Sequence, residues 1–169
     1  MAFSLYAATV PVFKQYLNGL DAILTKAEGH ATVGKIEPDA LLQGRLFPDM
    51  FTFVRQVQLS TSWAREITAR LAGLEVPEYE KTEHSFGDLH ALIAKTLAYL
   101  DGVSASAIEG QSEREIVLRP GTPREHHFTG QSYLLNYALP QFFFHVTTAY
   151  AVLRSSGVVI GKRDFLGQY

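Results

Sequence analysis

The sequence predicts a mainly α-helical protein, a bundle of four long helices with a short β-hairpin between the third and the fourth. Three observations lead to this prediction. Apolar residues recur at steps of three and four in four segments, which is the spacing of one face of a helix. Glycines, prolines and cap residues separate these segments. The stretch REIVLRPGTPREHHFTG instead holds two short β-like runs around a Pro-Gly turn, which is typical of a hairpin.

The first helix is predicted from an apolar stripe near the start of the chain. Its members are Tyr6, Val10, Phe13, Leu17, Leu20 and Leu24. Pro11 is compatible with this helix only within or just before the first turn, or as a kink. We expect Gly29 and the glycine-containing TVGK to end the helix. A short helical turn at PDALLQGR should follow, with Pro38 at its first position.

The second long helix is predicted from near FPDM to a stop at Gly73. Its apolar face carries Met50, Phe53, Val57, Ala64, Ile67 and Leu71. At 100° per residue, Gln56 and Ser60 fall inside this stripe. A polar group that is buried in this way must find a hydrogen-bond partner or lose stability.

The third helix follows LEVPEYEKTEH, which we interpret as a linker. Ser85 precedes Asp88 by three residues, as in a helix cap. The apolar face comprises Phe86, Leu89, Ile93, Leu97 and Leu100. His90 lies at the margin of that face.

The last helix is predicted over 131–156, with Pro140 kinking or dividing it and Gly157 ending it. Gln141 and His145 share one face with Leu134, Ala138, Ala149 and Val152. Phe143, Val146 and Tyr150 occupy the opposite face. A helix that is apolar nearly all round is central or has a second partner. We therefore predict a homodimer.

Composition indicates one ordinary globular domain over residues 1–169, with 47% apolar residues and a net charge of −2. The scattered basic residues argue against nucleic acid as a partner. The chain has no cysteine, which excludes disulfides, thiolate nucleophiles and cysteine-bound zinc. The first basic residue is Lys14, so no signal-peptide pattern is seen, and no apolar run is long enough for a membrane span. We expect a cytoplasmic protein.

His145 is the most informative candidate for a functional residue because it lies inside QFFFHVTTAYAVLR. A second metal ligand on the same helix face would be four residues away. That position holds Gln141, whose neutral amide is a poor ligand for zinc. His126 and His127 are neighbours on a strand and should point to opposite faces, so local spacing provides no strong metal site. Motifs of serine hydrolases, phosphate loops and dinucleotide-binding folds are absent from the sequence.

The inward polar side chains suggest a small polar pocket. The candidates for its lining are His145, Gln141, Gln56, Ser60 and His90. They could bind a small molecule or hydrogen-bond to one another. We expect His145 to be neutral at pH 7 and to hold a hydrogen bond with an amide, either Gln141 on its own helix or Gln56 across the bundle.

The segment QFFFHVTTAYAVLRSSGV resembles the last helix of the DinB/YfiT-like superfamily, helical bundles regarded as metalloenzymes. The whole chain more closely resembles a nearby family of unknown function from bacteria and fungi. The stretches that carry this likeness are PDMFTFVRQVQ, FTGQSYLLNYALPQFFFHVTTAYAVLR and GKRDFLG. The resemblance implies four helices, a hairpin before the fourth and a homodimer.

The resemblance also implies a metal triad, with one histidine from the second helix and an H-x-x-x-H pair on the fourth. His145 matches the second member of that pair, but Gln141 stands at the first, and Gln56 lies near the place of the third ligand. The leading interpretation is a metal-free dimeric bundle, without a cofactor, whose polar pocket binds a small molecule or which serves as an interaction module. The alternative is a metal-dependent transferase or hydrolase that uses zinc or nickel, with His145 as a weak candidate ligand.

Overall fold

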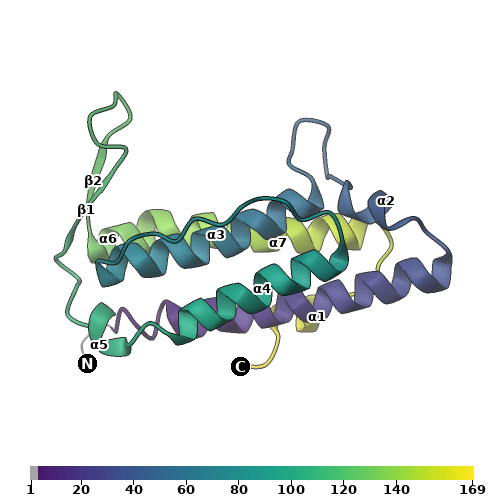
Figure 1. The fold of residues 1–169 in the computed structure, drawn as a ribbon, viewed down its shortest axis with the longest axis horizontal. Helices are drawn as coiled ribbons and strands as arrows, with labels where there is room; N and C mark the ends of the chain where they lie inside the picture. Colours follow the sequence, from purple (N-terminus) through teal and green to yellow (C-terminus); the bar gives the residue numbers. More distant parts are fainter. Residues whose placement is uncertain (1–3) are drawn as a thin grey trace.

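A computed structural model describes residues 4–169 and confirms the mainly helical prediction. Four long helices lie along the long axis of the molecule (Figure 1). They are α1 (Val10–Gly34), α3 (Phe53–Ala72), α4 (Phe86–Asp101) and α7 (Leu139–Ser155). The predicted hairpin lies between α4 and α7 in the chain. Its strands β1 (Glu115–Leu118) and β2 (His126–Thr129) pair antiparallel, with Ile116 opposite Phe128.

Short helical elements connect the long helices. They are α2 (Pro38–Leu42), α5 (Ala105–Ile108), α6 (Gly130–Tyr133), the π-helix η1 (Leu134–Ala138) and α8 (Lys162–Leu166). The sequence predicted α2 from Pro38, which is a first-turn residue of that helix. It did not predict α5 and α8, because four or five residues are too few to display a helical period.

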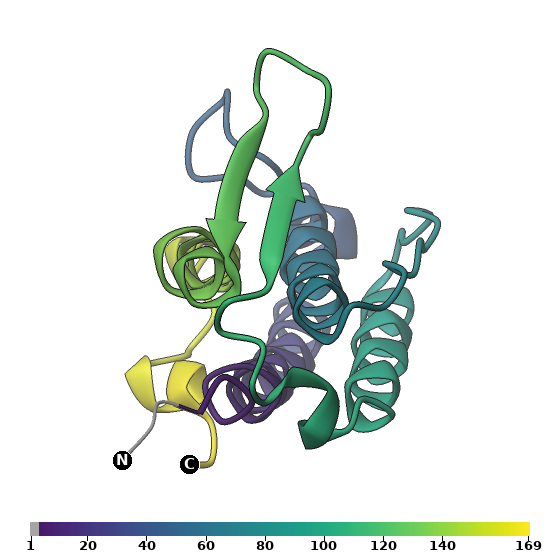
Figure 2. The ribbon, with the colours of Figure 1, turned by 90° about the vertical axis from the view of Figure 1, so that its left-hand side faces the viewer.

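The helix directions place a long connector across the bundle. Figure 2 shows α7 and α4 on opposite sides of the molecule, with α3 and α1 between them. Helices α3 and α4 run in the same direction, so residues 74–85 must return along the length of α3 before α4 can begin (Figure 1). We call residues 74–85 the connector. Its path over α3 and α4 determines where the cavity described below can form.

The end of α1 confirms one of the two predicted stops. The helix passes through Gly29 and ends at Gly34, the glycine of TVGK, where Lys35 adopts a left-handed conformation with φ of 51°. A glycine inside a helix costs about 1 kcal/mol relative to alanine. Continuing the helix buries Ala31, which is 4% exposed, and extends the packed apolar stripe. One glycine is therefore insufficient to end a helix that still has core to cover.

The predicted boundaries of the next two long helices are confirmed closely. Helix α3 begins after Thr52, whose side chain accepts a hydrogen bond from the backbone N–H of Arg55, so Met50 precedes it. It ends at Gly73, where φ is 68°. Helix α4 begins after Ser85, whose side chain accepts from the backbone N–H of Asp88. Side-chain oxygens of this kind satisfy N–H groups that have no partner in the first turn.

The last helical segment is continuous through Pro140 but contains an irregular turn. Helix α6 passes into the π-helix η1, and α7 starts at Leu139 with Pro140 in its first turn. Proline cannot donate a backbone hydrogen bond and its ring collides with the preceding turn of an α-helix. The wider π turn ahead of Pro140 accommodates both effects. Gly157 follows the helix with φ of 91°, as expected of a helix stop.

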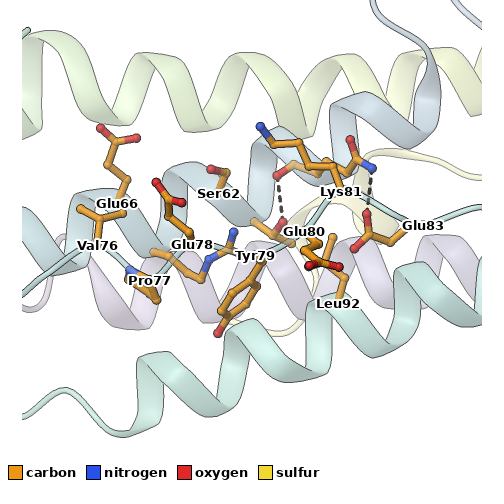
Figure 3. A pocket seen from close by; sticks show the side chains of 13 residues that line it. Ser62, Glu66, Val76, Pro77, Glu78, Tyr79, Glu80, Lys81, Glu83 and Leu92 are labelled. Carbon is orange, nitrogen blue, oxygen red and sulfur yellow. Dashed lines mark hydrogen bonds between the residues drawn. The ribbon is translucent and has the colours of Figure 1, made fainter.

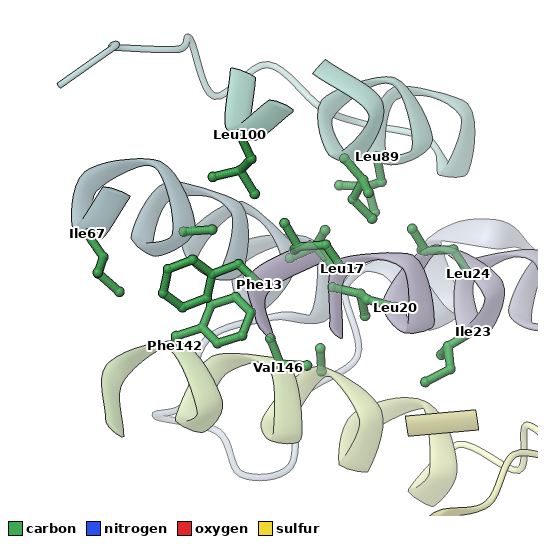
Figure 4. Close-up of a cluster of buried hydrophobic side chains, with 14 of the residues drawn as sticks. Phe13, Leu17, Leu20, Ile23, Leu24, Ile67, Leu89, Leu100, Phe142 and Val146 are labelled. Atoms are coloured by element: carbon green, nitrogen blue, oxygen red, sulfur yellow. The ribbon is translucent and has the colours of Figure 1, made fainter. Parts of the chain in front are cut away.

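The core is formed where the four long helices meet (Figure 4). Phe13 and Phe142 pack at its centre with 4.7 Å between their ring centroids. The second apolar face of α7 is also covered within the chain, because Phe143 packs on Tyr16 and Tyr150 packs on Phe165 of α8. The reasoning that led to a homodimer from this face was therefore wrong, since α1 and α8 do the covering. The oligomeric state itself stays a prediction.

None of the helices within residues 4–169 combines the length and apolarity that crossing a bilayer requires.

Candidate functional site

His145 and Gln56 form a buried polar pair between α7 and α3. The Nδ1 atom of His145 lies 2.8 Å from the Oε1 atom of Gln56. His145 is 7% exposed and Gln56 is 1% exposed. Since an amide oxygen only accepts hydrogen bonds, Nδ1 of the imidazole is the donor and carries the proton. The predicted hydrogen bond across the bundle is confirmed.

His145 is neutral in this environment. Burial, together with the positive charge of Arg55, lowers its pKa from 6.5 to about 4. Charging an imidazole away from water is unfavourable unless a carboxylate compensates it. The ring instead meets the Gln56 amide and, edge to face, the ring of Phe144. These contacts agree with the neutral state that the sequence predicted.

The other predicted pocket residues do not all join this pair. The Ser60 hydroxyl donates to the carbonyl oxygen of Gln56 on its own helix at 2.8 Å, which uses its proton locally. Gln141 is half-buried, and the hydrogen bond of His145 goes to Gln56 instead of to Gln141. His90 belongs to α4, and α4 lies across the bundle from α7 (Figure 2). Nδ1 of His90 is 2.6 Å from Oδ1 of Asp21. The structure therefore separates His90 from His145.

The residues near His145 do not fit the metal that the superfamily resemblance implies. Nδ1 of His145 carries a proton and cannot coordinate a metal ion, so Nε2 is the one ring nitrogen that could. Gln56 and Gln141 offer only neutral amides, which bind zinc or nickel weakly, so one good ligand is present where a zinc site needs three or four. Within residues 4–169, no group of three or more His, Cys, Asp or Glu side chains could hold a metal ion.

A cavity of about 280 Å³ lies on the other side of α3, below the connector (Figure 3). Its lining comes from α3, the connector and α4. Arg65 of α3 lies against it and is only 5% exposed. Nη1 of Arg65 donates to the Thr96 hydroxyl at 3.0 Å, whereas its Nε is buried and has no partner among the described residues.

Tyr79 of the connector covers Arg65. The guanidinium carbon of Arg65 is 3.8 Å from the centroid of the Tyr79 ring, and Nζ of Lys95 is 3.9 Å from the same centroid. Two cations cannot share one face of a ring at these distances, so Tyr79 is held between them. Each such contact contributes about 0.5–2 kcal/mol. Tyr79 thereby fixes the connector to both α3 and α4.

The charge around Arg65 is unusual for a buried guanidinium. Burial lowers the pKa of Arg65, but the group stays protonated because the pKa of arginine is so high. In the part of the chain that the structure describes, no carboxylate is within salt-bridge distance of it. Four glutamates line the cavity farther out: Glu66, Glu78, Glu80 and Glu83. Sequence reasoning missed this cavity, because the connector has no helical or strand period. The only signal was a tyrosine among the charges of VPEYEK.

Comparison with known proteins places the chain in a family. A family model with the description "Domain of unknown function (DUF1993)" matches residues 5–166. The chain belongs to the DUF1993 family. The DUF1993 chain is also similar to a crystal structure of a DinB family member protein from Shewanella denitrificans, with 37% sequence identity and a TM-score of 0.91. The match covers 98% of this chain and 93% of that chain, so the DinB-like fold is confirmed. No curated protein matches the DUF1993 chain.

Proposed function

We propose that the protein is a metal-independent helical bundle that binds a small molecule. The observation that carries this proposal is the hydrogen bond from Nδ1 of His145 to Oε1 of Gln56. This bond pairs His145 with a neutral amide in the region where the superfamily resemblance implies a second metal-binding histidine. The polar pair then stabilises the packing of α7 on α3, and binding is left to a different part of the molecule.

The cavity below the connector is the best-supported place for the ligand. It is lined by two long helices and the connector, and one of its lining residues, Arg65, is a buried charged group with an unused hydrogen-bond donor. Small-molecule sites are typically concavities of about 300–1,000 Å³ with a few converging polar groups. A cavity of about 280 Å³ lies just below that range and suits a ligand of only a few heavy atoms.

Elemental analysis tests the metal-independent part of the proposal. Protein purified without a chelating tag should contain far less than one zinc, nickel, iron or manganese per chain. A stoichiometric metal that is lost in a His145→Ala variant would contradict the proposal and favour a metal-dependent transferase or hydrolase. Zinc affinity should appear when Gln56 and Gln141 are both replaced by histidine, which restores the three ligand positions of the superfamily resemblance.

A thermal-shift screen against a mixed set of small metabolites tests the binding part. At least one compound should raise the Tm, because a ligand that binds only the folded state stabilises it. The same compound should have less effect on a Tyr79→Ala variant, which lacks the cover of the cavity. If no compound in a broad set raises the Tm, the binding proposal is wrong.

A further inference from the structure

We infer that the cavity below the connector recognises a small zwitterion, with a carboxylate held by Arg65 and a cationic group held by the glutamates at the rim. The inference rests on the proposed function, that the protein binds a small molecule, and adds the chemical class. Two observations support it: Nε of the buried Arg65 has no hydrogen-bond partner, and the other charged residues of the lining are mostly glutamates.

Arg65 has N–H groups along the edge of its guanidinium that make no hydrogen bond and could bind a carboxylate. A guanidinium binds carboxylates in its own plane, through N–H groups along its edge. Tyr79 stacks over the face of the group, which does not compete for those N–H groups. Thr96 takes one donor on Nη1, and Nε has no partner. An unpaired buried donor on a charged group is costly, and a ligand carboxylate would remove that cost.

The rim of the cavity selects against a simple anion. Glu66, Glu78, Glu80 and Glu83 line it, and Lys81 is the one other cation in the lining. Glu66 already pairs with Arg70 and Glu83 accepts a hydrogen bond from Gln58, so the exposed Glu78 and Glu80 are the main candidates to hold the cationic group. A multiply charged anion such as phosphate would be repelled by these carboxylates. A simple cation would be repelled by Arg65 at depth. A molecule with a carboxylate at one end and an ammonium at the other satisfies both regions.

Opening the connector breaks the contacts of Tyr79 with Arg65 and Lys95 and the bond from Gln58 to Glu83, but few backbone hydrogen bonds. Within it, the backbone N–H of Leu74 bonds to the end of α3 and the N–H of His84 bonds to Asp88, and the segment between has no regular secondary structure. Segments with few backbone hydrogen bonds open more readily than helices do. Since Nε of Arg65 is buried below Tyr79, the ligand enters as the connector shifts and Tyr79 then closes over it.

Titration of the intact chain with simple zwitterions tests the inference. The probes are glycine, β-alanine and γ-aminobutyrate, compared with butyrate, butylammonium and inorganic phosphate. The readouts are the NMR resonance of the Arg65 Nε–H group and the Kd from calorimetry. At least one zwitterion should shift that resonance and bind about tenfold more tightly than butyrate and butylammonium, because it contacts both regions. Equal binding of butyrate, strongest binding of phosphate, or no shift with any probe would overturn the inference.

Matched variants complete the test. Arg65→Lys should weaken binding of that zwitterion about tenfold or more, because an ammonium lacks the planar edge. Arg154→Lys, on the exposed surface of α7, is the control and should leave the Kd unchanged. If Arg65→Lys does not fold, the double variant Glu78→Gln/Glu80→Gln decides, since both side chains are exposed. It should lose the preference for the zwitterion over butyrate, and a retained preference would refute the assignment.

Different results would contradict the zwitterion inference and the proposed function. If other metabolites raise the Tm while every zwitterion is inert, only the ligand class is wrong. If a metal is found at His145 while zwitterions still bind at Arg65, only the metal-independent part of the proposed function is wrong.

Discussion

The His145→Leu substitution should destabilise the protein even though leucine fills similar space. Gln56 is 1% exposed, and its Oε1 accepts the hydrogen bond from His145. Leucine cannot donate, so this buried acceptor would lose its partner at a cost of about 1–3 kcal/mol. For a chain of this size, each kcal/mol lowers the Tm by about 2–4 °C. Urea unfolding followed by circular dichroism measures the loss directly.

A double-mutant cycle supplies the control. Replacing both partners by apolar residues removes the unpaired group, so Gln56→Leu/His145→Leu should be more stable than the sum of the single losses predicts. The coupling free energy should reach about 1 kcal/mol or more. If His145→Leu is as stable as the parent, or if the stability loss of the double variant equals the sum of the two single losses, the hydrogen bond between His145 and Gln56 does not stabilise the fold.

The same pair should make stability depend on pH. The unfolded imidazole takes up a proton at a pH of about 6.5, whereas the folded one does so only near 4, because of burial. Between these values the unfolded state binds more protons, so stability falls as the pH decreases from about 6.5 towards 4. The contribution of His145 to this loss is at most about 3 kcal/mol. Unfolding at about pH 7 and about pH 5 should show a smaller difference in His145→Leu than in the parent, and equal differences would refute the argument.

Three further predictions concern other parts of the molecule. NMR titration of His127 should give a pKa above 6.5, because its ring nitrogens bond to Glu125 and Glu115 on the hairpin; a value at or below 6.5 would contradict this. Gly19→Val should loosen α8 and speed tryptic cleavage within it, since a Cβ there would come within 3.2 Å of backbone oxygens of α8; Gly29→Val, with open space around it, is the control and should cleave like the parent. The superfamily resemblance implies a homodimer, so sedimentation at micromolar concentration should give twice the mass of one chain; the mass of a monomer would contradict that implication.

Helical periodicity was sufficient to place His145 and Gln56 on inward faces, but it left Gln141 and Gln56 as alternative partners of the histidine. His145 and Gln56 fall inside apolar stripes, and a buried polar group in such a stripe needs a partner across the bundle. Periodicity could not place His90, because the side of the bundle on which α4 lies depends on the path of the connector. The Arg65 cavity escaped prediction for the same reason. Its cover, Tyr79, lies in a segment whose position is determined by the directions of α3 and α4.

The π-helix η1 has a consequence for how this chain tolerates insertions and deletions. A single π turn is equivalent to one extra residue in an α-helix. The wider turn stacks residue i over i+5 instead of i+4, so it absorbs that extra residue. Deleting one residue from Leu134–Ala138 should therefore convert η1 to an α-turn and leave the same face of α7 against α3. A deletion in α7 ahead of His145 would instead rotate the rest of the helix by about 100° and carry His145 away from Gln56.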